Sequence, residues 1–401
     1  MTPRLLIVYC GLLMTATAFS VDITLPFFVT ISAQLDAPFH SVQMTVTAYI
    51  FAIGVGQLVF GSLSDRFGRR MAVACGLTLY IAGALLGSLA PTVEWLVAAR
   101  VVQGLGGAAG PVIARAILRD QYAGMALAKN MAVASGIFAL GPILAPLIGI
   151  ALSDLSGSWR VVFYAMMAFG CLLLFALAAV PETLRRRDPD ALSPGVFLRN
   201  IVTVFRHPQS RFFFLLCAGI MISMLSVVTI LPRIFMQGFG LSGRQFGLMF
   251  AVHGTGLILG QIANHRMIGT FGIVRTAWLA SMVVAVSAAA ICLAGLIGIS
   301  SPYPLMALTV LFAVGYMIVF SNASSMAMEP HGEIAGFTAS FLGFFSQIAA
   351  AACVTLMAAL VGSDIVLWGG SLTLIAAAAL LALTLWLRRP LTPAAGWTPS
   401  R

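Results

Sequence analysis

Apolar residues occur along this chain in long runs that are separated by short polar stretches. Runs of about twenty residues recur over the whole length, and each can cross about 30 Å of hydrocarbon as an α-helix. The pattern predicts an all-α membrane protein. Its twelve predicted spans lie near residues 5–31, 42–63, 71–90, 93–117, 127–152, 161–180, 211–236, 245–265, 275–297, 304–326, 335–360 and 366–387.

One long polar interruption separates six spans from six spans. The sequence therefore predicts an N-terminal six-helix bundle (1–184), a cytoplasmic linker (185–210), a C-terminal six-helix bundle (211–390) and a cytoplasmic tail (391–401). Apolar residues in the linker fall near one helical face, with arginines between them. We expect a short basic helix that lies on the anionic inner leaflet as a tether. Its apolar residues are Val196, Phe197, Ile201, Val204 and Phe205.

The two halves also repeat weakly. Gly56-Gln57 and Phe67-Gly68 recur as Gly260-Gln261 and Phe271-Gly272, and all four positions have an offset of 204 residues. A shared offset across equivalent spans supports a duplicated six-helix unit, as many transporters have. The fold class that we predict is two pseudo-symmetric six-helix bundles.

Composition excludes a soluble globular protein, because 60% of the residues are hydrophobic and only 8% are charged. The net charge of +10 does not indicate a nucleic-acid partner, since 18 of the 22 basic residues fall on one side of the predicted spans. Basic residues concentrate on the cytoplasmic side, so both termini are expected there. The six cysteines lie singly in apolar segments, which argues against a metal site.

An acid interrupts the first apolar run. Asp22 is followed four residues later by Pro26, which has no N–H to donate to the carbonyl of residue 22, so the helix should bend there. A carboxylate in the bilayer costs at least ~2.5 kcal/mol and usually marks a path for protons or substrate. The alternative is an acid near the membrane surface that contacts water and has no role.

Two motifs carry further charges. The segment Gly61–Arg70 joins the second and third spans and contains Asp65, Arg66, Gly68, Arg69 and Arg70. The fourth span contains Arg100-Val-Val-Gln103-Gly104. Both motifs resemble signatures of the major facilitator superfamily, the first being its G-x-x-x-D-R-x-G-R-R/K loop. The resemblance implies two bundles around a central cavity.

Further motifs refine the resemblance. The fifth span contains Gly141, Pro142, Pro146 and Gly149, which resemble the family's antiporter motif, although Ala145-Pro146 replaces a usual glycine pair. Pro181–Leu184 after the sixth span is also family-like. The context of Asp22 and the length of 401 residues are most similar to the bicyclomycin/chloramphenicol-resistance exporters.

The resemblance implies a conformational latch in the outward-facing state. Asp65, Arg69 and Asp120 match the family's latch positions, and the neighbouring Arg66 and Arg70 belong to the same loop. The alternative for Asp120 is a simple pair with Arg119 beside it.

Arg100 is the second intramembrane charge and, like Asp22, falls in the outer half of its span. The first and fourth spans are neighbours in the family's fold, so the two charges can pair and carry proton coupling. The alternative is that Arg100 binds carbonyls and holds two helices together. The predicted substrate-binding residues are Asp22, Tyr49, Arg100, Gln103, His253 and Gln347.

Tyr49 and His253 share the 204-residue offset and can face each other across the cavity. Because histidine titrates near neutral pH, His253 is a candidate proton carrier or hydrogen-bond partner of the substrate. The alternative is a packed, hydrogen-bonded histidine. Gln347, beside Phe344 and Phe345, is a weaker candidate for the cavity wall.

These features predict a proton-coupled exporter of small, largely apolar drugs or metabolites, phenicol- or bicyclomycin-like, with Asp22 as proton carrier. The alternatives are an uptake symporter or facilitator and an intramembrane enzyme. Motifs of hydrolases and P-loop ATPases are absent from the sequence, which disfavours the enzyme. We expect a monomer in the bacterial inner membrane that interacts with substrate, protons and lipid, without a cofactor or metal.

Overall fold

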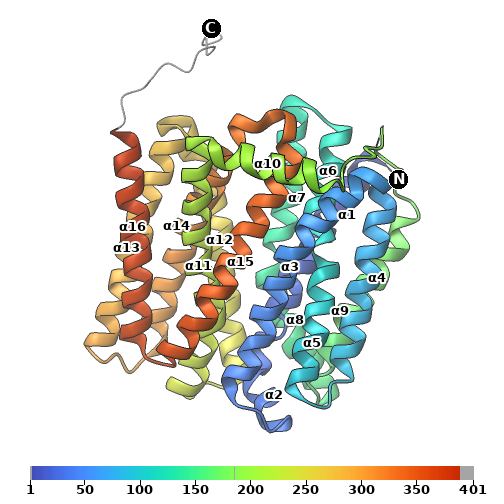
Figure 1. Ribbon diagram of the computed structural model, residues 1–401. Helices are drawn as coiled ribbons and strands as arrows, with labels where there is room; N and C mark the ends of the chain where they lie inside the picture. The colour runs from blue at the N-terminus through green and yellow to red at the C-terminus, as the bar shows by residue number, and fades with distance from the viewer. Residues whose placement is uncertain (1, 185, 389–401) are drawn as a thin grey trace.

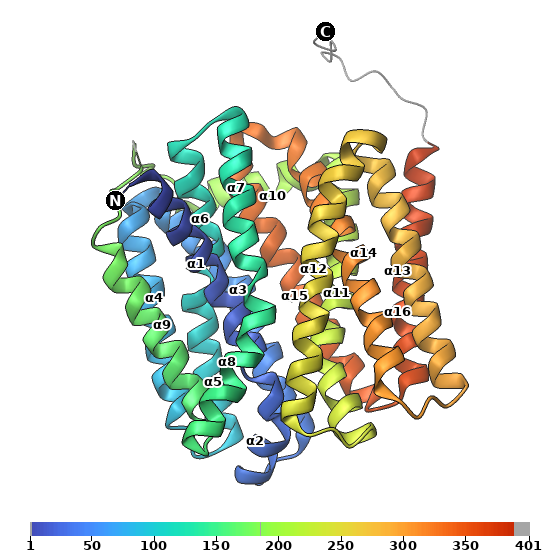
Figure 2. The ribbon, with the colours of Figure 1, turned by 180° about the vertical axis from the view of Figure 1, so that it is seen from behind.

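The computed structural model describes residues 2–184 and 186–388, and all regular elements in these ranges are helices. Arg185 and the predicted tail 391–401 lie outside the described residues. The helices form two halves that stand side by side, as Figure 1 and the opposite view in Figure 2 show. The predicted all-α fold class is confirmed.

The two ends of the bundle differ, and each is named here by a helix. The start of α1 (Pro3–Asp22) and the end of α16 (Ile365–Leu387) lie at the end that α10 (Pro194–Arg206) crosses, which we call the α10 end. The opposite end carries α2 (Phe28–Gln34) and is called the α2 end.

The N-terminal half runs from α1 to α9. Its other elements are the 3-10 turn η1 (Leu25–Phe27), α3 (Phe39–Phe67), α4 (Arg69–Ser88), α5 (Val93–Gly107), α6 (Ala109–Gln121), α7 (Gly124–Ala139), α8 (Gly141–Ser156) and α9 (Val161–Leu177). The fourth and fifth predicted spans are each interrupted once, at Ala108 and at Leu140.

The C-terminal half begins with α11 (Pro208–Arg233) and ends with α16. Between them lie the π-helical turn η2 (Ile234–Gly238), α12 (Gly243–Phe271), α13 (Ile273–Leu296), α14 (Pro302–Met328), the 3-10 segment η3 (Glu329–Ile334) and α15 (Ala335–Val361). A capping box of Ser242 and Gln245 begins α12, and the side chain of Asp364 caps α16.

The number of spans agrees with the sequence. Ten helical segments of the described residues are long and apolar enough to cross a membrane, and one of them, Pro302–Val361, contains both α14 and α15. Counting both helices and adding the shorter apolar α9 gives the twelve predicted spans.

The repeat is visible in the packing as well as in the sequence. A Cβ added to Gly56 of α3 would lie 2.7 Å from the Leu105 carbonyl oxygen, and one added to Gly260 of α12 would lie 2.6 Å from that of Val314. The equivalent glycines therefore admit equivalent close helix crossings in the two halves. The exact limits of the predicted domains stay a prediction.

The linker helix α10 forms where it was predicted, but the expected position of its apolar face was wrong. Phe205 makes edge-on ring contacts with Phe341 and Phe345 of α15, at centroid distances of 5.6 and 5.5 Å, and Phe197 contacts Phe337 at 5.5 Å. The aromatic rings of this face pack against the C-terminal half and not on a lipid surface, because α15 supplies a phenylalanine cluster at the right spacing.

The most extensive contacts between the two halves are made by two helix pairs, α3 with α15 and α8 with α12. At the α2 end, Gln43 of α3 also donates a 2.6 Å hydrogen bond to the carbonyl of Thr229 in α11. At the α10 end, a cavity of about 260 Å³ lies between the halves, bordered by residues of α3, α6, α10 and α15. The two halves thus contact each other at the α2 end, and at the α10 end they border a cavity beside contacts such as that of Gly61 in α3 with Ser340 in α15.

Candidate functional site

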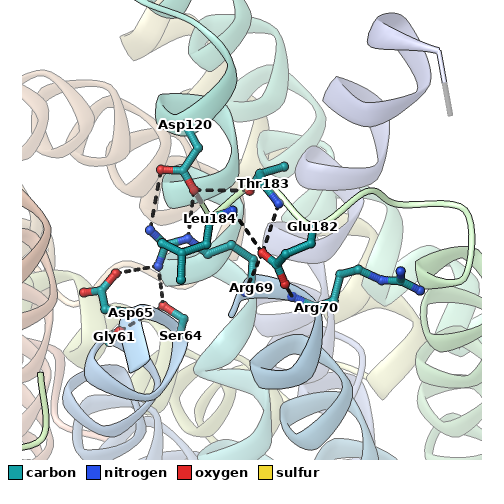
Figure 3. Close-up of polar contacts among 9 residues, drawn as sticks. All are labelled: Gly61, Ser64, Asp65, Arg69, Arg70, Asp120, Glu182, Thr183 and Leu184. Carbon is teal, nitrogen blue, oxygen red and sulfur yellow. Dashed lines mark hydrogen bonds and ion pairs between the residues drawn. The ribbon is translucent and has the colours of Figure 1, made fainter. Parts of the chain in front are cut away.

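At the α10 end, helices of the N-terminal half bring one arginine between two aspartates (Figure 3). Arg69, at the start of α4, is only 2% exposed. Its Nε donates to Oδ2 of Asp120 in α6 at 2.9 Å, and its Nη1 donates to Oδ1 of Asp65 in α3 at 2.5 Å and to Oγ of Ser64 at 2.8 Å. A buried guanidinium held by two carboxylates fixes the ends of three helices relative to one another. The structure therefore brings Asp65, Arg69 and Asp120 together.

Glu182, which follows α9, caps the start of α4. Its Oε1 accepts from the backbone N–H of Arg69 at 3.0 Å, and its Oε2 accepts from that of Arg70 at 3.1 Å. Oε1 also accepts from the N–H groups of Thr183 and Leu184. Burial disfavours the charged carboxylate, but these backbone donors outweigh burial and hold the pKa of Glu182 below its ordinary value.

Thr183 connects this cap to the arginine, because its Oγ1 donates to Oδ2 of Asp120 at 3.1 Å. We call Asp65, Arg69, Asp120, Glu182 and Thr183 the ionic network. Glu182 and Thr183 belong to the family-like segment Pro181–Leu184, but the sequence did not predict their contacts with Arg69 and Asp120. The sequence does contain one indication of this role. Glu182 is an acid directly after the sixth span, on the same side of the membrane as the loop motif Gly61–Arg70.

The other two arginines of the loop motif lie apart from this network. Arg66 Nη1 donates to the carbonyl of Pro189 in the linker at 3.3 Å. The side chain of Arg70 points away from Asp65 and Asp120 (Figure 3). Both arginines are exposed.

Arg119 does not pair with Asp120, so the simpler alternative for this acid is wrong. Its guanidinium lies instead against Gly336 of α15, where an added Cβ would come within 3.1 Å of Nη1. Arg119 and Arg115 both border the cavity at the α10 end.

Asp22 is the last residue of α1 and is 5% exposed. The helical bonding breaks there, because the N–H of Thr24 donates to the carbonyl of Val21, at 3.3 Å, and η1 follows with Pro26. The predicted bend is therefore present. The Asp22 carboxyl forms no ion pair or hydrogen bond with any residue in the described parts of the chain.

Arg100 of α5 is 1% exposed and binds across to α1. Its Nη2 donates to the Ser20 carbonyl at 2.7 Å, and its Nη1 donates to Oε1 of Gln103 at 2.8 Å. The guanidinium carbon lies 4.2 Å from the ring centroid of Tyr49. The Ser20 carbonyl lacks its helical donor because Thr24 turns to Val21, so the break at Asp22 creates the acceptor that Arg100 uses.

The pairing of Asp22 with Arg100 that the sequence allows is not formed in this conformation. The three ion pairs among the described residues involve other groups, and none contains Asp22 or Arg100. Arg100 instead has the contacts expected of the alternative, a residue that binds a carbonyl and holds α5 against α1. A role of either residue in proton coupling stays a prediction.

Tyr49 and His253 do not face each other. Tyr49 donates to the carbonyl of Thr17 at 3.4 Å, whereas His253, 1% exposed, stacks on Phe250 with ring centroids 5.3 Å apart. No hydrogen bond or ring contact joins the two among the residues described here. Each side chain packs within its own half. His253 matches its alternative in packing but not in hydrogen bonding, because neither ring nitrogen has a hydrogen-bond partner among the described residues.

The two predicted glutamines occupy different environments. Gln103 is buried and donates to Met166 Sδ at 3.3 Å, as part of the Arg100 cluster. Gln347 lies between the halves. A Cβ added to Gly54 of α3 would lie 3.4 Å from the Cβ of Gln347. Sequence reasoning missed Gln57, whose side chain fills the space that a side chain on Gly343 of α15 would need.

The residues of the antiporter-like motif lie on α8, between α1 and α12. A Cβ on Gly149 would lie 2.9 Å from the carbonyl oxygen of Ile23, directly after Asp22. On another side of α8, Pro142 and Ile143 border Gly254 of α12. Gly141 lies near Thr15 of α1. The motif therefore joins the helix break at Asp22 to the opposite half.

A second contact joins the same break to α12 directly. A Cβ on Gly243, the first residue of α12, would lie 2.0 Å from the carbonyl oxygen of Pro26. A Cβ on Gly247, one turn later, would lie 2.6 Å from Ile150 Cδ1 and 3.0 Å from Pro26 Cγ. We call Pro26, Ile150, Gly243 and Gly247 the α2-end contact. It closes the molecule beside Asp22.

Two halves of long apolar helices with a cavity between them are typical of a multi-pass membrane transporter. Residues 10–354 match the family model described as Major Facilitator Superfamily. The chain belongs to the major facilitator superfamily.

Named relatives agree with this family. An uncharacterised transporter of the same family, YdgK of Bacillus subtilis, is 30% identical over 342 residues, which is 83% of each chain. A bicyclomycin resistance protein homolog of Haemophilus influenzae is 28% identical over 337 residues, again 83% of each chain. Multidrug resistance protein D of Escherichia coli is 25% identical over 339 residues, 84% of each chain.

Solved structures share the fold. The xylose transporter XylE of Escherichia coli matches with a TM-score of 0.74 at 15% identity, over 96% of this chain and 97% of that one. The family and its relatives are membrane transporters and not enzymes, which confirms that part of the prediction. The family resemblance inferred from the motifs is confirmed as well.

Proposed function

We propose that the protein exports small, largely apolar drugs or metabolites from the cytoplasm of a bacterium, in exchange for protons, by alternating access. It lies in the inner membrane with the α10 end and both termini in the cytoplasm. The relatives that are named for bicyclomycin and multidrug resistance support export, and the distribution of basic residues supports the orientation.

One observation carries the proposal: Asp22 is a buried carboxyl with no ion-pair or hydrogen-bond partner among the described residues, and it lies at a helix break that contacts the opposite half. A charged carboxylate that is buried alone is costly, whereas the protonated carboxyl is tolerated. Gain and loss of a proton at Asp22 therefore act on the turn that follows it. That turn is held by the α2-end contact.

The two ends suit successive steps of transport. The conformation described here has a cavity of about 260 Å³ at the α10 end, where cargo from the cytoplasm is admitted. Opening to the outside requires Pro26 to separate from Gly243. A proton from outside then reaches Asp22, and cargo leaves on that side.

Arg100 provides the counter-charge in this scheme. It is anchored at the Ser20 carbonyl, two residues before Asp22, and its guanidinium lies on the ring of Tyr49. When Asp22 loses its proton, the carboxylate attracts Arg100, and the link between α1 and α5 changes. Gln103 and Tyr49 act as positioning residues for the guanidinium. The ionic network is formed here although the α2 end is closed, so it acts as a latch among α3, α4 and α6 that is not restricted to the outward-facing state expected from the family resemblance.

The sign of proton movement tests the direction of transport. Everted vesicles that contain the protein are acidified inside by respiration, and chloramphenicol or bicyclomycin is added outside while a dye reports the internal pH. Antiport predicts that the added compound makes the interior more alkaline. Vesicles without the protein provide the baseline.

The alternative function, uptake by proton symport, predicts the opposite sign, because cargo and protons then enter the vesicle together. A facilitator predicts no change of pH while labelled cargo equilibrates. A resistance screen over a drug panel, in cells that lack their own exporters, selects the compound to use. Absence of resistance to every compound, together with no proton movement, would contradict drug export.

A further inference from the structure

An open groove lies on the C-terminal half at the α10 end, between α13 and α16, which stand side by side in Figure 1. Its volume is about 470 Å³. Trp278 Nε1 donates to Oγ1 of Thr384 at 2.9 Å and so joins the two helices within the groove. The groove is lined by Phe271, Arg275, Trp278, Leu279, Thr384, Leu387 and Arg388.

The two arginines of this groove have no acidic partner in the part of the chain that the structure describes. Arg275 and Arg388 are exposed, and neither forms an ion pair with a residue that the structure describes. Two positive charges in one groove repel each other, so an anion placed between them is favoured. The lining contains no aspartate or glutamate.

The rest of this half cannot readily supply a carboxylate. Residues 211–388 contain only three acids, Glu329, Glu333 and Asp364. Asp364 caps the opposite end of α16, about 36 Å from Arg388 at 1.5 Å per residue. Glu329 accepts a 2.8 Å hydrogen bond from Gln209, and both glutamates lie in η3 between α14 and α15. The anion that fits the groove therefore comes from outside the chain.

The remaining walls are apolar, and they lie where the apolar spans end. Arg275 is in the first turn of α13 and Arg388 directly follows α16, so both are expected at the level of the lipid headgroups. Phe271 and Leu387 are 47% and 40% exposed beside them. A soluble anion would contact only the arginines, whereas a phospholipid would contact both the arginines and the apolar walls.

We propose that this groove binds an anionic phospholipid, whose phosphate lies between Arg275 and Arg388 and whose acyl chains lie along Phe271 and Leu387. Basic pockets between transmembrane helices on the cytoplasmic side are suited to such headgroups. The lipid would supply the negative charge that the C-terminal half lacks at this end.

The test measures lipid binding to the purified full chain by native mass spectrometry, with phosphatidylglycerol and phosphatidylcholine as probes. The double variant Arg275→Gln/Arg388→Gln is expected to bind phosphatidylglycerol roughly 30-fold more weakly, because each basic residue near the membrane surface contributes to anionic-lipid affinity. Arg4→Gln/Arg70→Gln removes two exposed arginines at the same end of the other half and should retain the affinity within about twofold. The charge-preserving variant Arg275→Lys/Arg388→Lys should also retain most of it.

Three results would overturn the proposal. Equal loss of phosphatidylglycerol in both glutamine variants would indicate a general effect of charge. Equal affinity of the wild type for phosphatidylcholine would show that the arginines do not select an anion. Displacement of the lipid by an equal concentration of inorganic phosphate would assign the groove to a soluble anion. Matching thermal melting curves of the variants establish that a loss of binding is not a loss of fold.

Discussion

At the α10 end, the two halves of this transporter differ in the burial and ion pairing of their basic residues. In the N-terminal half, Arg69 is buried between Asp65 and Asp120, and Glu182 caps the helix that Arg69 begins. In the C-terminal half, the equivalent loop, at Phe271-Gly272, has neither the acid nor the paired arginine. Arg275 and Arg388 are exposed there, and neither has a counter-ion within residues 2–184 and 186–388.

The comparison shows that the two halves share their close helix crossings but not their charged contacts. The helix crossings at Gly56 and Gly260 are alike, because close backbone packing is required in both halves. The charges are not alike, since among the described residues only the N-terminal half contains an internal ionic latch. The substitutions below test whether the N-terminal half also contains the coupling groups and whether the C-terminal half closes onto them.

The largest effect is expected from removing the buried cation of the ionic network. Arg69→Gln leaves Asp65 and Asp120 without their shared partner. It should reduce the free energy of unfolding by about 3 kcal/mol, the lower end of the range for broken buried pairs, because the Asp65 side chain is 43% exposed. Thermal melting of the purified protein measures the loss. Arg70→Gln, whose side chain points away from the network, should change stability by less than about 0.5 kcal/mol. Equal effects of the two variants would contradict the asymmetry within this loop.

A smaller loss is expected at the second buried arginine of the N-terminal half. Arg100→Gln leaves the Ser20 carbonyl without its donor, which should cost about 2–3 kcal/mol of stability. Arg100→Lys retains the charge but not the planar fork, so it should recover part of the stability. If Arg100→Lys is stable and still exchanges cargo but does not accumulate it, Arg100 acts in coupling; loss of stability alone indicates the structural role.

The substitution of one glycine by alanine tests the contact between the halves at the α2 end. Gly243→Ala places a Cβ 2.0 Å from the Pro26 carbonyl oxygen, so closure should become less favourable by at least ~1 kcal/mol. Spin labels on the exposed Leu155 and Tyr303, in a chain without its cysteines, should then report longer distances across this end.

Gly269→Ala is the matched control on the same helix, because nothing lies within 4 Å of its added Cβ. Its distances should equal those of the unsubstituted protein. An unchanged distance distribution in Gly243→Ala would show that the α2-end contact does not limit closure.

The smallest effect is expected at Glu182, and it depends on pH. Backbone donors hold its pKa below the ordinary value, so its stabilisation is complete above the pKa of an unfolded glutamate and is lost as the pH falls through its folded value. Glu182→Gln should reduce stability by about 0.5–1 kcal/mol near neutral pH, as for other helix caps. The difference from the wild type should shrink below about pH 4.3, the ordinary range for glutamate. A difference that grows on acidification would assign the effect to another group.

Local sequence motifs predicted the ionic network better than they predicted the intramembrane site. Asp65 and Arg69 are four residues apart on either side of a turn at Gly68, whose φ of +105° few other residues adopt. This geometry depends on neighbouring residues alone. The prediction that Asp120 joins Asp65 and Arg69 came from the family resemblance. Glu182 was missed because its contacts are with backbone N–H groups, which carry no signal in a side-chain motif.

The arrangement around Asp22 depends on helix rotations that no local pattern encodes. Proline at position 26 predicted the break, but it did not predict that the break would free the Ser20 carbonyl and that Arg100 would bind it. For the same reason Tyr49 and His253, related by the repeat, point to different partners. The apolar face of α10 was assigned to lipid because the sequence does not show that α15 covers it.

The most direct test of proton coupling is uphill transport by Asp22→Asn in proteoliposomes, with the cargo that the resistance screen identifies and the membrane potential held at zero. Exchange of one proton across one pH unit sustains about tenfold accumulation of cargo. The wild type should reach that ratio in vesicles that are acidic inside. Asp22→Asn should still exchange labelled for unlabelled cargo but should not accumulate it. Accumulation by Asp22→Asn to the same ratio would contradict the assignment of Asp22 as the proton carrier.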